Sequence, residues 1–326
     1  RLFGNTGANT LNGGDGNDVL IGFRDVAGSG RGVQGAYGLV DGNDTLDGGA
    51  GDDYLGGGVG ADAMTGGTGS DYFVVDNAGD VVNEADTSAA GGIDTIESSI
   101  DFSLAANAST AGVENLVLSG DAYRGTGNAL ANVISGSDAD NVLIAGAGND
   151  TVYGFDGYDV MGGGAGNDYL AGDLGDDVLS GEADNDTLDG GEGDDYLSGG
   201  TGSDTYQFGG DFGIDRVANT SSTSATDQDE IQLMDLTSDQ VWFSRSGDNL
   251  MITQVGSANS IQVDKWFIDA NAQVDVIRAF GDGGYINAAD VNSLVTAMAG
   301  FTPQDLSAGT APAQLVTLKD QAWHVA

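Results

Sequence analysis

The sequence predicts an all-β fold: a parallel β-roll in which short strands stack coil upon coil, interrupted by a short connector and closed by a C-terminal β-rich capping region with one helix. Three observations predict it. A unit of nine residues recurs without slippage from Gly127 to Gln207, and such self-similarity marks a solenoid. Glycine supplies 57 of the 326 residues, so turns with positive φ are frequent. Acidic residues number 51 against 9 Lys or Arg, which gives a formal net charge of −42.

This composition excludes several classes of function. Phosphate binding needs basic patches, so no nucleic acid is expected as a partner. The chain has no cysteine and a single histidine, His324, which removes disulfides, thiolate metal sites and most histidine chemistry. Oxygen atoms are the metal ligands that remain. No apolar stretch approaches the roughly 18 residues that cross a bilayer, so we expect a protein that is not membrane-spanning.

The larger array contains nine units in register. They begin at Gly127, Gly136, Ala145, Gly154, Gly163, Gly172, Gly181, Gly190 and Gly199. Position six is Asn132, Asn141, Asp150, Asp159, Asp168, Asp177, Asp186, Asp195 and Asp204. Position eight is apolar in every unit, from Ile134 to Tyr206. A disordered acidic linker has no reason to keep that period.

A smaller array of the same unit lies near the start. Its position-six residues are Asn9, Asp18, Asp44, Asp53, Asp62 and Asp71. About seventeen extra residues, 23–39, interrupt it, and we expect them to form a loop pushed out of one turn.

The consensus of both arrays is Gly-Gly-x-Gly-x-Asp-x-Leu-x. It resembles the RTX nonapeptide of haemolysin-type calcium-binding proteins. The resemblance covers about 135 residues, and the flanking regions are similar to segments that accompany such arrays in secreted bacterial proteins.

The spacing predicts how the carboxylates lie. The first six residues of a unit form a turn and the last three a short strand, so two units make one coil of about eighteen residues, and coils stack about 4.8 Å apart. Asp residues eighteen apart then line the same edge, where they repel each other unless a cation lies between them. Ca²⁺ suits this place because it takes six to eight oxygen ligands in flexible geometry.

The resemblance implies the ligands of each ion. In the family, the carbonyls of positions two and four and the Asp of one turn act together with the carbonyls of positions one and three and the Asp of the turn eighteen residues later. Here one ion is assigned to Gly146, Gly148, Asp150, Gly163, Ala165 and Asp168. Carbonyl ligands are also expected at Gly49, Gly51, Gly164, Gly166, Gly191 and Gly193.

Pairs of Asp one coil apart predict about eight calcium ions. The second array supplies Asp150 with Asp168, Asp168 with Asp186, Asp186 with Asp204, Asp159 with Asp177, and Asp177 with Asp195. The first supplies Asp18 with Asp53 across the insertion, Asp44 with Asp62, and Asp53 with Asp71. The departures are Asn132 and Asn141, which carry less charge, and Leu130, Ala139 and Asp184 in place of the fourth-position glycine.

The composition divides the chain into five parts: a first array at 1–74, a connector at 75–126, a second array at 127–209, a capping domain at 210–301 and a tail at 302–326. Val113 to Leu116 resembles a connector common between RTX arrays, and we expect 75–126 to continue the solenoid with longer turns; the alternative is a separate binding domain. The capping domain has aromatic residues such as Trp242 and Trp266, which favour a core that covers the end of the solenoid over a sugar-binding platform.

One helix is expected from Asn287 to Gly300, with Asn287 as its N-cap and Gly300 as its stop. By resemblance, the tail holds an uncleaved signal for the type I secretion machinery; the alternative is a plain disordered tail. His324 is expected to be an ordinary residue of that tail and not a ligand.

The sequence thus predicts a calcium-binding module of a secreted bacterial protein, extracellular or at the cell surface, that folds on export when calcium fills its sites. The alternatives are a self-associating structural surface protein, such as an adhesin, surface-layer or filament subunit, and the non-catalytic C-terminal part of a secreted hydrolase. One histidine cannot make His-Glu-x-x-His, and no Gly-x-Ser-x-Gly occurs, so no catalytic residues are expected in this chain.

Overall fold

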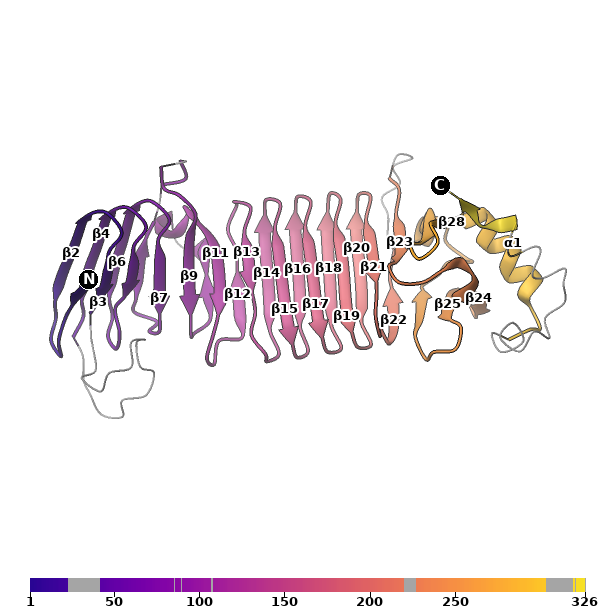
Figure 1. Cartoon of the computed structure of the whole chain (residues 1–326), viewed down its shortest axis with the longest axis horizontal. Coiled ribbons are helices and arrows are strands. Elements are labelled where there is room, and N and C mark those ends of the chain that lie inside the picture. The colour runs from indigo at the N-terminus through magenta and orange to yellow at the C-terminus, as the bar shows by residue number, and fades with distance from the viewer. Residues whose placement is uncertain are drawn as a thin grey trace. The chain divides into compact units, whose positions relative to one another are not determined.

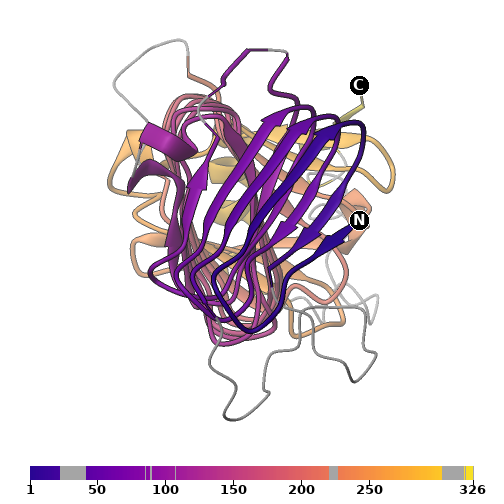
Figure 2. The ribbon, with the colours of Figure 1, turned by 90° about the vertical axis from the view of Figure 1, so that its left-hand side faces the viewer.

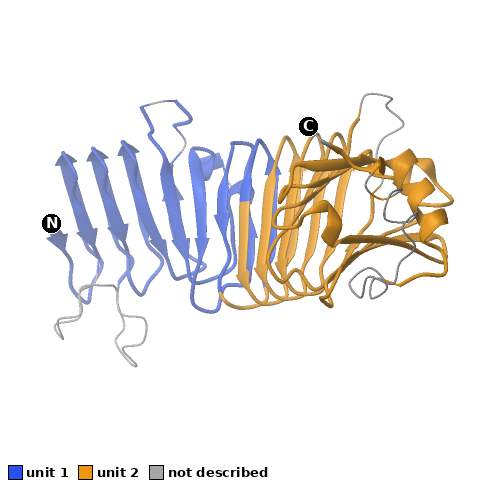
Figure 3. Cartoon of the chain, turned by 45° about the vertical axis from the view of Figure 1, so that its right-hand side comes forward, with its two compact units in different colours: residues 1–137, 141–151 blue, residues 138–140, 152–326 orange. Residues whose placement is uncertain are grey.

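Short β-strands are the main regular structure of the chain (Figure 1). The computed structural model describes residues 1–22, 42–84, 86–88, 90–106, 108–219, 227–302, 319 and 321–325. The expected loop at 23–39 lies outside these residues. The chain forms two compact units (Figure 3): unit 1 comprises residues 1–137 and 141–151, and unit 2 comprises residues 138–140 and 152–326.

Unit 1 is a stack of parallel strands, which Figure 2 shows end-on from the N-terminal side. One sheet has the order β1-β3-β5-β7-β9-β11-β13, a second β2-β4-β6-β8, and a third β10-β12-β14. The bounds are β1 (Leu2–Phe3), β2 (Thr10–Asp15), β3 (Val19–Ile21), β4 (Thr45–Ala50), β5 (Tyr54–Gly56), β6 (Ala63–Thr68), β7 (Tyr72–Val75), β8 (Val81–Asn83), β9 (Asp94–Ser98), β10 (Phe102–Ser103), β11 (Val113–Leu118), β12 (Arg124–Thr126), β13 (Val133–Ser135) and β14 (Val142–Ala147), with 3₁₀ turns η1 (Leu104–Ala106) and η2 (Ala108–Thr110).

The connector continues the solenoid instead of forming a separate domain. Its strands β9 and β11 lie in the same sheet as β7, and the seam passes in register from Phe73 to Ile96 and on to Leu116. The longer turns absorb the irregular spacing, because these partners are 23 and 20 residues apart while those of the arrays are 18 apart. An apolar residue therefore enters the core once per coil even where the nonapeptide is absent.

Unit 2 contains the larger part of the second array and the capping region. One sheet has the order β15-β17-β19-β21-β23-β27-β28-β29, and the other β16-β18-β20-β22-β26-β25-β24. The bounds are β15 (Thr151–Asp156, of which Thr151 belongs to unit 1), β16 (Val160–Ala165), β17 (Tyr169–Leu174), β18 (Val178–Ala183), β19 (Thr187–Glu192), β20 (Tyr196–Thr201), β21 (Thr205–Phe208), β22 (Ile214–Val217), β23 (Glu230–Leu233), β24 (Val241–Ser246), β25 (Asn249–Gln254), β26 (Ser260–Val263), β27 (Val276–Ala279), β28 (Gly284–Asn287) and β29 (His324–Val325), with 3₁₀ turns η3 (Ser238–Gln240) and η4 (Ala270–Ala272).

Position eight of the nonapeptide forms the core, as the sequence predicts. Leu170, Leu179, Leu188 and Leu197 have no exposed surface, and fully burying each such side chain contributes about 1.5–3 kcal/mol. The strands are longer than expected: β18 runs from position seven of one unit through position three of the next. The last three residues of a unit and the first three of its successor therefore act as one strand.

The capping region ends the parallel stacking. Strand β26 pairs in parallel with β22, and the antiparallel strands β25 and β24 follow it. Trp242, Phe243 and Trp266 are at most 2% exposed, so they form a core, as expected. The predicted helix is present as α1 (Ala288–Met298), and the Asn287 side chain caps it by accepting from Asp290 N. An all-β parallel roll with helix α1 in its capping region confirms the predicted fold class.

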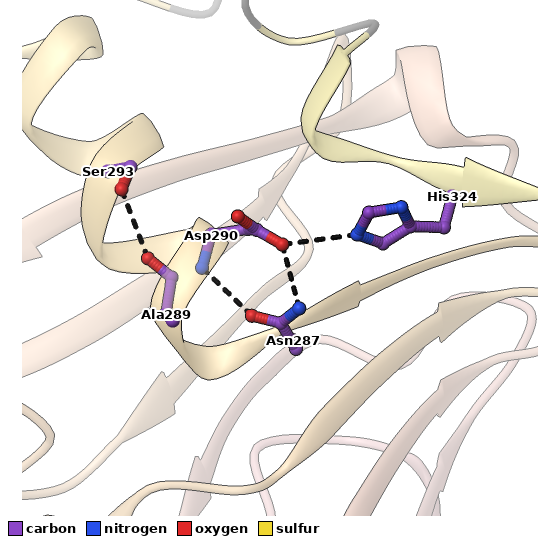
Figure 4. A network of polar contacts seen from close by, with 5 residues as sticks. All are labelled: Asn287, Ala289, Asp290, Ser293 and His324. Carbon is purple, nitrogen blue, oxygen red and sulfur yellow. Dashed lines mark hydrogen bonds and ion pairs between the residues drawn. The ribbon is translucent and has the colours of Figure 1, made fainter.

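The last described residues belong to the cap, which corrects the expected boundary at residue 301. Strand β29 pairs antiparallel with β28, and the Trp323 ring is 8% exposed and packs near Phe243. His324 Nε2 lies 3.1 Å from Asp290 Oδ2, within the hydrogen-bonded group at the start of α1 (Figure 4). The apolar ring of Trp323 gives this segment a reason to dock that the composition of the tail did not reveal. Residues 303–318 lie outside the described part of the chain.

Within the described residues, no helix is long and apolar enough to cross a membrane.

Candidate metal centre

The acidic residue at position six is held by a backbone hydrogen bond from the coil before it. In unit 1 the amide nitrogen of Asp44 donates to Asp62 Oδ1 over 2.7 Å, and that of Asp53 donates to Asp71 Oδ1 over 2.8 Å. The pair across the insertion also meets, since Asp18 N donates to Asp53 Oδ1 over 2.6 Å. We call a series in which each carboxylate accepts from the amide of the acid one coil earlier a carboxylate ladder.

Two carboxylate ladders run through unit 2. In the first, Asp159 N donates to Asp177 Oδ1 and Asp177 N to Asp195 Oδ1, both over 2.8 Å. In the second, Asp168 N donates to Asp186 Oδ1 over 2.8 Å and Asp186 N to Asp204 Oδ1 over 3.0 Å. All these residues are at most 3% exposed. The structure therefore brings together the predicted pairs of unit 2.

The second carboxylate oxygen, Oδ2, has no hydrogen-bond donor among the described residues in several members of the ladders. In the described part of the chain, Oδ2 is buried and accepts no hydrogen bond in Asp44, Asp53, Asp71, Asp177, Asp186, Asp195 and Asp204. A buried anionic oxygen without a partner is costly. No Lys or Arg occurs between Arg31 and Arg124 or between Arg124 and Arg216, the two stretches that contain these residues. The missing positive charge must come from solution.

Glycine at position one makes room for that oxygen. A β-carbon on Gly172 would overlap Asp177 Oδ2, and one on Gly190 would overlap Asp195 Oδ2. The carbonyl oxygen of Gly172 also faces Gly154 one coil earlier, only 2.9 Å from where a β-carbon would lie. Carboxylate and carbonyl oxygens therefore face the same small space beside the Cα atom.

Positions two and four need positive φ, which glycine adopts most easily. Gly191 and Gly193 have φ of 99° and 147°, and β-carbons there would overlap the carbonyl oxygens of Asp173 and Gly175 one coil earlier. Other predicted ligands with positive φ are Gly49, Gly51, Gly146, Gly148, Gly164 and Gly166. The turns therefore direct the carbonyls of positions two and four toward the next coil.

Burial and neighbouring carboxylates raise the pKa of several ladder residues. Burial raises the pKa of Asp186 to about 8, and the charges of Asp204 and Asp168 add to the effect. Burial likewise raises the pKa of Asp177 to about 6 and that of Asp195 to about 7. Without a cation, ionising Asp186 is therefore unfavourable at neutral pH, and ionising Asp177 or Asp195 is less favourable than ionising an exposed aspartate. A divalent ion that binds oxygen atoms relieves the repulsion directly.

The donor set consists of carboxylate and carbonyl oxygens, which are the ligands that Ca²⁺ prefers. The family model of the RTX calcium-binding nonapeptide repeat matches residues 1–23, 40–73, 126–161, 135–170 and 171–206. The chain contains RTX calcium-binding nonapeptide repeats. It is a calcium-binding protein of the repeat type, and the buried ladders are where these RTX repeats present their acids.

The residues predicted for one RTX ion belong to different units, and each set is described within its own unit. Gly146, Gly148 and Asp150 belong to unit 1, where Asn132 N donates to Asp150 Oδ1 over 2.6 Å. Gly163, Ala165 and Asp168 belong to unit 2, where Gly163 leaves room for Asp168 Oδ2.

The turns with Asn at position six close in a different way. Asn132 Nδ2 donates to Glu114 O over 3.0 Å and to Asn128 Oδ1 over 3.2 Å, while Asn132 Oδ1 accepts from Asn128 N over 2.7 Å. The amide NH₂ group of Asn132 thus donates to oxygen atoms of the kind that are predicted to bind calcium in the other RTX turns. Asn9 Nδ2 does the same with Asn5 O, over 3.0 Å. These turns are satisfied by hydrogen bonds and need no cation.

The ladders extend beyond the nonapeptides to residues that the sequence analysis missed. In unit 1, Asp62 N donates to Asp80 Oδ1 over 3.0 Å and Asp71 N to Asp94 Oδ1 over 2.7 Å. In unit 2, Asp195 N donates to Asp215 Oδ1 over 2.9 Å, Asp204 N to Asp229 Oδ1 over 3.0 Å, and Asp229 N to Asp275 Oδ2 over 3.0 Å.

The missed residues share a signal with the RTX units. Each is followed two positions later by a buried apolar residue: Val82, Ile96, Val217, Ile231 and Ile277. A search for Asp-x-apolar at the start of each strand finds them, whereas a fixed period of nine does not, because the connecting turns are longer there.

Proposed function

We propose that this chain is a calcium-responsive module of a secreted bacterial protein, and that it folds on export when extracellular calcium fills the sites between stacked turns. The observation that carries the proposal is the set of buried Asp Oδ2 atoms that accept no hydrogen bond among the described residues, in stretches of the chain that are almost free of Lys and Arg. About eight ions, one for each Asp pair, would neutralise about 16 of the 42 net negative charges.

The mechanism is linkage between binding and folding. The ligand set of each ion comes from two successive coils, so it exists only in the folded form. Extracellular calcium modules bind at about 10⁻⁴ to 10⁻³ M, a concentration that the cytosol does not reach. A site filled at a hundred times its Kd stabilises the folded form by about 2.7 kcal/mol. Several such sites determine whether the chain folds.

The same linkage supports export before folding. A chain held open by its own carboxylates inside the cell is a substrate for a type I secretion channel, and calcium outside then prevents return. The module would act extracellularly or at the cell surface, as a folding and anchoring element and not as a catalyst. The oxygen clusters of the ladders are accounted for by metal binding, which leaves no separate acid and base for hydrolysis.

Small-angle scattering on the full chain tests the proposal, first in EGTA with 5 mM Mg²⁺ and then in 10 mM Ca²⁺. We expect a radius of gyration near roughly 60 Å, the value for an unfolded chain of this length, to collapse with Ca²⁺ but not with Mg²⁺. Compact scattering in EGTA would overturn the proposal. Mass that grows with protein concentration only in Ca²⁺ would instead select the self-associating surface protein.

A further inference from the structure

A different carboxylate cluster lies where the first array meets the connector. Asp71, Glu84 and Asp94 each place a carboxylate oxygen within 4.8 Å of the others. The three side chains are 2%, 2% and 0% exposed. Asp71 and Asp94 are consecutive members of a ladder, but Glu84 belongs to neither the ladder nor a nonapeptide.

Glu84 stands where the next coil would place its first glycine. Strands β6 and β8 pair Thr65 with Asn83, which sets Glu84 opposite Gly66, the first residue of the unit that ends the array. Its backbone is fixed on both sides, because Glu84 N donates to Ser109 O over 2.5 Å and Gly112 N donates to Glu84 O over 2.9 Å. A carboxylate side chain thus enters a place where the repeat units have glycine or, at Ala145, alanine.

The carboxylates converge on the space in front of Gly66. A β-carbon on Gly66 would overlap Asp71 Oδ2 and would lie 2.6 Å from Glu84 Oε2. Glu84 Oε2 accepts one hydrogen bond, from Gly67 N over 3.2 Å. Among the described residues, Oδ2 of Asp71 and Oδ2 of Asp94 are buried and accept none. Gly69 O faces Gly92 in the next turn, as the position-four carbonyls of the arrays do.

We propose that Asp71, Glu84 and Asp94 form a calcium site with three carboxylates at the junction of the first array and the connector. It rests on the calcium binding of the proposed function but differs from the repeat sites in its third acid. Three negative charges around one small space bind a divalent ion more tightly than two, because ligand charge sets the affinity of oxygen sites. This site fills first as the calcium concentration rises, and it fixes the connector to the last coil of the first array.

The test is a calcium titration of the full chain, by calorimetry and by equilibrium dialysis, for the wild type and three variants. Glu84→Gln keeps the size and the acceptor for Gly67 N but removes the charge. Glu84→Gly restores the regular coil. Glu97→Gln is the matched control, since Glu97 lies nearby in β9 and accepts from Tyr72 Oη over 2.7 Å. We expect the tightest class of sites to contain one ion fewer in both Glu84 variants. The altered site should then need about tenfold more calcium to fill than it does in the wild type.

If Glu84→Gln keeps the same number of tightly bound calcium ions, or if Glu97→Gln loses one as well, the three-carboxylate site is overturned. The repeat sites are not affected by either result. A wild type without calcium binding would overturn the proposed function itself. If one Glu84 variant does not fold in 10 mM Ca²⁺, the other decides, because Glu84→Gln keeps the size of the side chain whereas Glu84→Gly removes it.

Discussion

Two adjacent glycines of the first array test whether a carboxylate occupies the space beside position one. Gly57 begins a unit whose position six is Asp62. Gly56, directly before it, is the last residue of strand β5. A β-carbon on Gly57 would overlap the Asp62 carboxylate and would lie 2.5 Å from Asp62 Cβ. A β-carbon on Gly56 would meet nothing closer than Tyr54 Cε1 at 3.6 Å. Gly57→Ala therefore displaces a ligand, and Gly56→Ala does not.

The expected magnitudes have opposite signs. The 2.5 Å approach in Gly57→Ala is about 1 Å inside normal contact, and overpacking of this kind costs about 1–3 kcal/mol. Displacing Asp62 empties at least one site, which in 10 mM Ca²⁺ removes about 2.7 kcal/mol of binding stabilisation if the Kd is about 10⁻⁴ M. The sum is about 4–6 kcal/mol. Gly56→Ala gains about 0.5–1 kcal/mol, because glycine weakens a strand.

Thermal unfolding in 10 mM Ca²⁺, followed by circular dichroism, measures the difference. At about 2–4 °C per kcal/mol for a unit of this size, Gly57→Ala lowers the transition of unit 1 by roughly 10–20 °C. Dialysis against calcium then shows at least one ion fewer per chain. If the two variants unfold at the same temperature and bind equal amounts of calcium, the Asp62 carboxylate does not lie beside Gly57, and the proposed role of position one is wrong.

Three further predictions follow from the ladders. The pKa values of Asp71, Asp94, Asp177, Asp186, Asp195, Asp204 and Asp215 are raised, chiefly by burial, from 3.8 to between about 6 and about 8. The folded form without calcium thus binds more protons than the unfolded form, so its stability falls as the pH rises from 4 to 8. Calcium competes with those protons, so the calcium concentration at which half of the chain is folded should be higher at pH 5.5 than at pH 8 when it is measured by circular dichroism. A midpoint concentration that does not depend on pH would contradict this. Asn132→Asp replaces the amide that donates to Glu114 O by a buried acid, which should destabilise the fold by about 1–3 kcal/mol at low calcium and add one ion at high calcium; an unchanged ion count in dialysis speaks against it. Asp184, with φ of 75°, is strained at position four, so Asp184→Gly should raise the chemical denaturation midpoint by an amount equal to about 0.5–1 kcal/mol, whereas a lower midpoint would show that its carboxylate has a role.

The nonapeptide predicts the regular part of the structure because each position meets one local requirement. Position eight must be apolar to reach the seam, and positions two and four must adopt positive φ, which Gly191 and Gly193 do. These requirements depend only on neighbours one coil away, so a fixed period reveals them. Phe155, Asp173 and Glu182 adopt the same φ without being glycine, because the stacked coils on either side fix the turn.

The irregular part was not predictable from a period. Asp94 and Asp215 follow the preceding ladder acids by 23 and 20 residues, and the length of a turn leaves no trace in the nonapeptide pattern. Glu84 was missed for another reason: its role depends on the pairing of β8 with β6, which places it opposite Gly66. The docking of Trp323 on the cap likewise depends on a contact far along the chain.

The unit that tolerates such variation is shorter than nine residues. In Asp-x-apolar, the amide and carboxylate of Asp join the ladder while the residue two positions later enters the seam, as with Asp177 and Leu179. A slip of one residue would remove the acid from its ladder and turn the apolar side chain out of the core. Register is therefore fixed twice in three residues, and the rest of a coil is free to lengthen. The apolar residue specifies where the strand lies, and the acid joins that strand to the ladder on which the proposed calcium dependence rests.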